Sequence, residues 1–237
     1  VDGKPCIKPA QKVSEDSVLE IEGLDHYVSR AAHKLIAGLD AFDVNATGRL
    51  ALDVGASTGG FTQVLLERGA AHVVSLDVGR AQISPKLRGD ERVSIIEGVN
   101  ARYLNRENLS GLLKREYLAD LVVADLSFIS LTQVIPALIE TASETADFVL
   151  LIKPQFEAGK HSLNANGIVT DHRARAGAIE QVCEHAEGLG LRIRELVRSD
   201  LPGTHGNIEY VLWISSQSGD YLSQWKSRIA ELVKEAK

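Results

Sequence analysis

Residues 50–61, Leu50-Ala51-Leu52-Asp53-Val54-Gly55-Ala56-Ser57-Thr58-Gly59-Gly60-Phe61, decide the fold of this chain. The apolar run that ends at Asp53 is typical of a buried strand, and the segment 62–68 returns to helical spacing. The glycines between them give the backbone the freedom that a tight turn needs. The stretch therefore predicts a strand, a glycine-rich turn and the N-terminus of a helix. In an open parallel sheet a nucleotide-like ligand binds at such a turn, because free N–H groups and the helix dipole favour its anionic groups.

Apolar stretches and helical spacing alternate along most of the chain. Further strands are predicted at 72–77, 92–97, 120–125, 146–153, 191–197 and 208–214, and helices at 30–42, 171–189 and 221–233, with Ser29 as the N-cap of the first helix. This alternation predicts an α/β fold with a doubly wound, mainly parallel sheet of seven strands. The short connection between the last two strands favours an antiparallel pair, so one reversed strand is expected at the edge of the sheet.

The composition places the chain among ordinary soluble proteins. Its 237 residues, 44% of them hydrophobic, suffice for one α/β domain with a small appendage, and the net charge of -6 argues against coating nucleic acid through bulk electrostatics. No apolar run approaches the length of a membrane helix and the chain does not open with a signal peptide, so a cytoplasmic location and no membrane partner are expected. Cys6 and Cys183 lack metal-ligand spacing, and no metal is expected.

The glycine-rich turn favours one cofactor over another. A dinucleotide-binding fingerprint would need a glycine at position 57, where the backbone approaches pyrophosphate, and this chain has Ser57. S-adenosylmethionine has no pyrophosphate but carries a carboxylate, an ammonium, a sulfonium and a ribose. Asp77 ends the next strand, where its carboxylate can accept hydrogen bonds from both ribose hydroxyls. The pattern thus predicts an S-adenosylmethionine pocket rather than an NAD site, with an ordinary structural turn as the alternative.

Four polar residues stand around this predicted core in the order Lys34, Asp125, Lys153 and Glu209. Asp125 and Lys153 each end an apolar strand, Lys34 borders the apolar stripe of the first helix, and Glu209 lies in the last strand. The surrounding sequences are Tyr-Val-Ser-Arg-Ala-Ala-His-Lys-Leu at 27–35, Ala-Asp-Leu-Ser-Phe-Ile-Ser-Leu at 124–131 and Lys-Pro-Gln-Phe-Glu-Ala-Gly at 153–159. Over residues 1–215 this pattern resembles the FtsJ-like ribose 2'-O-methyltransferases, and within them the TlyA-like subfamily that is often labelled hemolysin.

The resemblance implies a class I, Rossmann-like methyltransferase that transfers a methyl group from S-adenosylmethionine to a cytidine 2'-hydroxyl of ribosomal RNA within ribosomal subunits. It implies a cofactor site made of Asp53, Gly55, Ser57, Thr58, Gly59, Gly60, Phe61, Asp77, Asn100 and Asp125. TlyA-like chains open with an S4 RNA-binding domain, so residues 1–22 are expected to be its last portion, 23–28 a linker and 29–237 the methyltransferase domain. Most of the S4 domain is then missing from this chain.

The chemistry requires these residue types. A ribose hydroxyl is a poor nucleophile until a base removes its proton, and the methyl group must lie in line with that oxygen. Lys153 is the expected base, with Asp125 and Glu209 as its orienting partners and Lys34 as a second cation that steers Lys153 and the ribose. Three alternatives stay open. They are a binding module that is inactive without its S4 domain, a hemolysin-type membrane-active protein and, last, an NAD-linked oxidoreductase.

Overall fold

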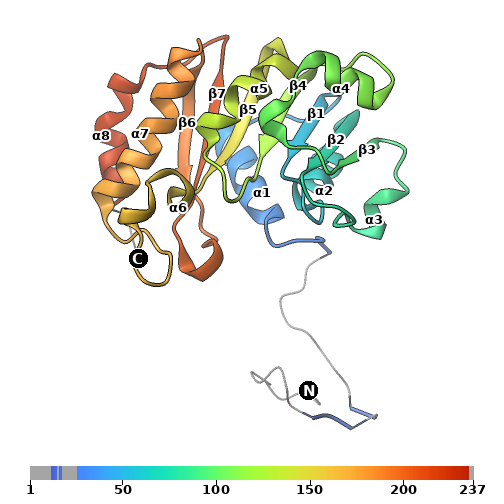
Figure 1. The fold of residues 1–237 in the computed structure, drawn as a ribbon, viewed down its shortest axis with the longest axis horizontal. Helices are drawn as coiled ribbons and strands as arrows, with labels where there is room; N and C mark the ends of the chain where they lie inside the picture. Colours follow the sequence, from blue (N-terminus) through green and yellow to red (C-terminus); the bar gives the residue numbers. More distant parts are fainter. Residues whose placement is uncertain (1–11, 15, 18–25, 235–237) are drawn as a thin grey trace.

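The structure, a computed structural model, describes residues 12–14, 16–17 and 26–234 (Figure 1). The strands are β1 (Leu50–Val54), β2 (His72–Asp77), β3 (Val93–Glu97), β4 (Ala119–Ala124), β5 (Ala142–Ile152), β6 (Arg192–Arg198) and β7 (Tyr210–Ser215). The α-helices are α1 (Ala32–Phe42), α2 (Gly60–Glu67), α3 (Pro85–Arg88), α4 (Arg106–Leu113), α5 (Ile135–Thr141), α6 (Pro154–Glu157), α7 (His172–Gly188) and α8 (Leu222–Leu232). Short 3-10 helices are η1 (Ala101–Tyr103), η2 (Leu131–Gln133), η3 (Lys160–Ser162) and η4 (Thr204–Gly206).

The strands form one sheet in the order β3-β2-β1-β4-β5-β7-β6. Neighbours from β3 to β5 pair in parallel, and β7 is antiparallel to both β5 and β6. The predicted α/β fold with a mainly parallel seven-stranded sheet is therefore confirmed. The position of the reversed strand differs from the prediction, because β7 inserts between β5 and β6 instead of lying at the edge. The short connection still makes β6 and β7 an antiparallel pair, but β7 is the partner that joins β5.

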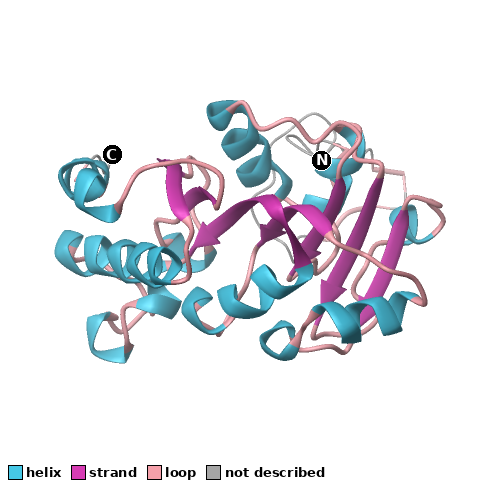
Figure 2. Cartoon of the chain, turned by 90° about the horizontal axis from the view of Figure 1, so that it is seen from above, coloured by secondary structure: helices cyan, strands magenta, loops and turns pink. Residues whose placement is uncertain are grey.

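Helices cover both faces of the sheet, as Figure 2 shows from above. Buried side chains of α4, α5, α7 and α8 pack against one face in a cluster that includes Leu52 and Val54, while those of α1, α2 and α3 pack against the other face with Ala51. Successive residues of β1 thus belong to opposite layers, as the pleat of a strand requires. Both layers are apolar, which explains why the strands read as nearly continuous hydrophobic runs.

Helix α1 lies unusually close to the sheet. A Cβ at Gly38 would come within 2.7 Å of a methyl carbon of Val211 on β7, so only glycine permits this approach. The helix begins at Ala32, two residues after the predicted start, because residues 30–31 form a turn in which the Ser29 hydroxyl accepts the Ala31 N–H at 3.1 Å. The close packing of α1 on β7 carries Lys34, one turn before Gly38, to the start of that strand.

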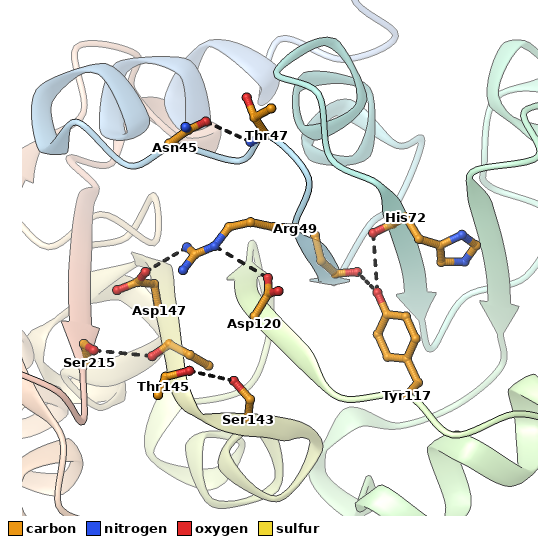
Figure 3. Close-up of polar contacts among 12 residues, drawn as sticks. Asn45, Thr47, Arg49, His72, Tyr117, Asp120, Ser143, Thr145, Asp147 and Ser215 are labelled. Atoms are coloured by element: carbon orange, nitrogen blue, oxygen red, sulfur yellow. Dashed lines mark hydrogen bonds and ion pairs between the residues drawn. The ribbon is translucent and has the colours of Figure 1, made fainter.

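A polar network closes the edge of the sheet at which β1, β4 and β5 begin (Figure 3). The Arg49 guanidinium lies 2.7 Å from the Asp147 carboxylate and 3.6 Å from that of Asp120, and the Trp213 indole N–H donates to Asp147 at 2.8 Å. The Tyr117 hydroxyl donates to the Ala51 carbonyl at 2.7 Å. These contacts tie neighbouring strands together at the edge opposite the glycine-rich turn.

Some predictions fall on residues that the structure does not describe. Most of the predicted S4 remnant at 1–22 and half of the linker at 23–28 lie outside the described residues. Within the described part of the chain, no helix has the length and apolarity needed to cross a membrane.

Candidate active site

The four predicted polar residues meet at the carboxyl edge of the parallel strands. Asp125 follows β4 directly and Lys153 follows β5 directly. Because β7 is reversed, its start lies at the same edge, where Tyr210 pairs with Ile152, and Glu209 immediately precedes it. Lys34 reaches this point from α1. The topology therefore gathers side chains that are up to 175 positions apart in the chain.

The four side chains form two ion pairs. Lys34 Nζ lies 2.5 Å from Glu209 Oε2, with side-chain exposures of 7% and 2%, and Lys153 Nζ lies 2.6 Å from Asp125 Oδ1, with exposures of 12% and 16%. Lys153 also donates to the Ser127 hydroxyl at 3.0 Å. Asp125 is thus placed as the predicted partner of Lys153. Glu209 differs from the prediction, since its carboxylate contacts Lys34 and not Lys153.

Two adjoining cavities open beside the Lys153–Asp125 pair. The larger, about 630 Å³, lies between the ends of β1, β2 and β4. The smaller, about 170 Å³, is lined by Lys153. Both are lined by Gly55, Ser57, Asp125 and Ser127. The Lys153–Asp125 pair therefore stands where the two cavities share a wall, which suits a reaction between a molecule in each.

The glycine-rich turn forms the floor of the larger cavity. Gly55 has a φ of 83°, and a Cβ there would lie 2.5 Å from the Asp125 carbonyl oxygen. Ser57 adopts a left-handed φ of 48°, and its N–H donates to Asp77 Oδ2 at 2.8 Å. The other Asp77 oxygen accepts the Gly79 N–H at 2.6 Å. Asp77 thus lines the cavity with both oxygens fixed by the backbone, and each oxygen keeps a lone pair for a ligand hydroxyl.

The predicted cofactor residues divide into three groups. The larger cavity is lined by Gly55, Ser57, Asp77, Asn100 and Asp125. The smaller cavity adds Gly60 and Phe61. Asp53, Thr58 and Gly59 line neither cavity. Thr58 instead donates its hydroxyl to the Val28 carbonyl at 3.3 Å, and Gly59 has a φ of 96° where the turn enters α2. These three residues support the conformation of the turn and do not line its cavities.

Asn100, a predicted cofactor residue, also has a structural contact just after the end of β3. It lines the larger cavity, and its side-chain oxygen accepts the Arg102 N–H at 3.0 Å at the start of η1. The polar end of the cavity is also lined by Gln82, whose amide oxygen accepts the Ser57 hydroxyl at 3.2 Å. Glu97 holds the turn that carries Gln82, because its carboxylate accepts the N–H groups of Ala81 and Gln82.

Phe128 is the functional candidate that the sequence prediction missed. The residue is 91% exposed, has a left-handed φ of 64° and lines the larger cavity. Its ring lies 5.1 Å from that of Phe156, which in turn lies 5.9 Å from Lys153 Nζ. An exposed aromatic side chain on a strained backbone is costly, and such strain is concentrated at functional sites. The sequence alone gives no signal of that backbone conformation.

Asp53 is wholly buried beneath the turn. It belongs with Ala51 to the face covered by α2, where the Thr62 hydroxyl donates to its Oδ2 at 2.6 Å. Burial, together with the smaller effects of the negative charges of Asp125 and Asp77, raises the Asp53 pKa to about 7 against the lowering effect of the Thr62 hydrogen bond. Asp53 therefore supports the turn from the α2 side and lines neither cavity.

This burial predicts a pH-dependent stability. The folded-state pKa of Asp53 is above the unfolded value, so its stabilising contribution is complete below pH 4 and declines as the pH rises to about 7. Asp53→Asn should match the wild type below pH 4 and exceed its free energy of unfolding above pH 7, by up to about 4 kcal/mol at 1.36 kcal/mol per pKa unit. Urea unfolding between pH 4 and pH 8 measures the difference. A gap that is the same at every pH would contradict the prediction.

Asp77 is expected to dominate ligand affinity in the larger cavity. Asp77→Ala should weaken S-adenosylmethionine binding more than tenfold, because it leaves the ligand hydroxyls without a charged acceptor. Calorimetric titration measures the affinity, with Glu116→Ala, an exposed acid before β4 at the opposite edge, as the matched control. An unchanged affinity would remove Asp77 from the site.

The comparison with known families decides between the alternatives. The model of the family described as FtsJ-like methyltransferase matches residues 27–216. The chain belongs to the FtsJ-like methyltransferase family. This membership confirms the prediction of a methyltransferase that uses S-adenosylmethionine, and it disfavours the NAD-linked and membrane-active alternatives.

Relatives of this FtsJ-like chain are similar over most of its length. The 16S/23S rRNA (cytidine-2'-O)-methyltransferase TlyA of Mycobacterium tuberculosis is 48% identical over 94% of this chain and 82% of its own. Hemolysin A of Brachyspira hyodysenteriae is 35% identical over 89% of this chain and 86% of its own. The solved structure of a hemolysin-named protein from Streptococcus thermophilus superimposes with a TM-score of 0.83 at 35% identity, covering 91% of this chain and 76% of that one.

Proposed function

We propose that this protein transfers a methyl group from S-adenosylmethionine to the 2'-hydroxyl of a cytidine in ribosomal RNA. The observation that carries the proposal is the Lys153–Asp125 ion pair, at 2.6 Å, on the wall that the two cavities share. The larger cavity has the volume, the acid and the glycine turn that the cofactor needs, and the smaller has room for a ribose in front of Lys153. A TlyA protein at 48% identity, named for this reaction, supports the choice of substrate.

In this mechanism the cofactor supplies a methyl group on a sulfonium. Lys153 Nζ would accept the proton of the ribose 2'-hydroxyl during the transfer, a general-base role for the side chain that lines the smaller cavity. Asp125 holds Nζ in place through its contact at 2.6 Å. The buried Lys34–Glu209 pair is linked to the turn after Lys153 by Gln155, whose amide donates to Glu209. The turn at Gly55 and Ser57 fixes the cofactor side of the wall.

The aromatic pair beside Lys153 supports an RNA substrate. Single-stranded nucleotides are recognised in proteins by stacking of their bases on exposed aromatic rings. Phe128, 91% exposed, stands next to Phe156 and lines the larger cavity. A nucleotide whose ribose faces Lys153 can stack its base on Phe128. We further propose that the protein acts on ribosomal subunits in the cytoplasm.

The proposal is tested by methyl transfer from radiolabelled S-adenosylmethionine to isolated ribosomal subunits and to free ribosomal RNA. The expected product resists alkaline cleavage at one nucleotide, because a 2'-O-methyl group blocks attack by the ribose oxygen. Label on a base would contradict the ribose assignment. Cofactor binding with no transfer to any ribosomal substrate would support the alternative of a binding module that needs an S4 domain.

A further inference from the structure

Glu209 is the most constrained member of the candidate active site. Its side chain is 2% exposed, and each carboxylate oxygen has its own partner. Lys34 Nζ lies 2.5 Å from Oε2, and the Gln155 amide donates to Oε1 at 3.1 Å. Gln155 stands two residues after Lys153, on α6. The amide therefore connects the turn that carries Lys153 to the buried Lys34–Glu209 pair.

Gly203 closes the remaining side of the same carboxylate. A Cβ at this position would lie 1.9 Å from Glu209 Oε1 and 2.5 Å from its Cδ, so any other residue would displace the carboxyl group. Such a clash is relieved cheaply only when the side chain can swing away. Glu209 cannot do so, because Lys34 and Gln155 hold its oxygens.

The loop that carries Gly203 is also held in place. Gly203 donates its N–H to the Asn207 carbonyl at 2.8 Å and accepts the Gly206 N–H at 3.1 Å. Asn207 is buried and bonds in turn to the backbone of Val169 and Gly167 at 3.2 and 3.0 Å. A side chain at position 203 would therefore push on Glu209 more readily than on its own backbone.

We propose that Gly203 and Gln155 are positioning residues for methyl transfer, which fix the Glu209 carboxylate and through it the ammonium group of Lys34. The inference rests on the proposed function. Neither residue lines the larger cavity, so their replacement acts on the reaction geometry and not on cofactor binding. Reactions between bound groups are sensitive to such displacements, and a misplacement of about 1 Å can lower a rate about 100-fold.

The test is a comparison of Gly203→Ala with Gly177→Ala. Gly177 lies on the exposed side of α7, and a Cβ there meets nothing within 4 Å. Gly203→Ala should lower kcat for methyl transfer to ribosomal subunits about 100-fold, with the Kd for S-adenosylmethionine within twofold of the wild type. Gly177→Ala should change neither. Gln155→Leu, which removes the donor to Glu209, should lower kcat in the same way with an unchanged Kd.

A second comparison shows whether Gly203 acts through Glu209. The Lys34→Met/Glu209→Ala background has no carboxylate at position 209 for the new Cβ to displace. Adding Gly203→Ala to this background should leave the melting temperature nearly unchanged. Adding Gly203→Ala to the wild type should lower the melting temperature. Equal losses in both backgrounds, or full activity of Gly203→Ala, would overturn the inference. Failure of the wild type to methylate any ribosomal substrate would instead count against the proposed function. The melting temperatures would still show whether a side chain at position 203 acts on the Glu209 carboxylate.

Discussion

Lys153→Arg is expected to abolish methyl transfer while the affinity for S-adenosylmethionine stays within a few-fold. Arginine keeps the positive charge beside Asp125 but does not deprotonate in proteins, so it cannot accept the proton of the ribose hydroxyl. General-base catalysis contributes about 10²- to 10⁴-fold to a rate, and Lys153→Ala should lose as much. Lost turnover with retained binding is the signature of an interaction made in the transition state.

Single-turnover methyl transfer and calorimetric titration of the same preparations measure the two quantities. Lys226→Arg, at an exposed position of α8, is the matched control and should behave as wild type. Melting temperatures identify any variant whose fold is damaged. Substantial activity in Lys153→Arg would reject Lys153 as the base and move that role to Lys34 or to solvent, while parallel losses of binding and turnover would indicate a structural lysine.

The sequence predicted best those site residues that lie at the carboxyl ends of parallel strands. Asp77, Asp125 and Lys153 follow apolar runs, and the carboxyl ends of parallel strands meet at one edge, so their convergence follows from the strand pattern alone. In the sequence Asp53 also follows an apolar run, so the same rule placed it at the end of a strand. Its strand extends one residue further, to Val54, and the pleat turns Asp53 towards α2 and away from the cavity.

Other features depended on contacts that no local pattern contains. Glu209 pairs with Lys34 because β7 inserts beside β5 and because Gly38 lets α1 approach Val211 within van der Waals contact. A periodicity argument placed Lys34 only at the border of the apolar stripe. The exposed position of Phe128 goes with its left-handed backbone conformation in a loop. Tertiary packing, and not residue propensity, sets that conformation.

Lys34→Ala is expected to cause the largest loss of stability among the site variants. It leaves the Glu209 carboxylate, 2% exposed, without its cation, and removal of one partner from a buried ion pair typically costs about 3–5 kcal/mol of the free energy of unfolding. The surface pair between Arg68 and Asp40, with side chains 41% and 54% exposed, provides the matched control. Arg68→Ala should cost about 0–1 kcal/mol, because solvent screens such a pair. Urea unfolding at pH 7 with linear extrapolation measures both free energies.

The double variant Lys34→Met/Glu209→Leu separates the role of the pair in stability from its role in the reaction. Replacing both charges with apolar side chains of similar size leaves no uncompensated charge, so most of the stability lost in Lys34→Ala should return. Methyl transfer should not return with it, because the fixed charges that Gln155 links to the Lys153 turn are gone. A stable double variant with wild-type turnover would show that the pair serves the fold alone. A loss of stability in Lys34→Ala no larger than that in Arg68→Ala would show that the buried Glu209 carboxylate does not need Lys34 as its partner.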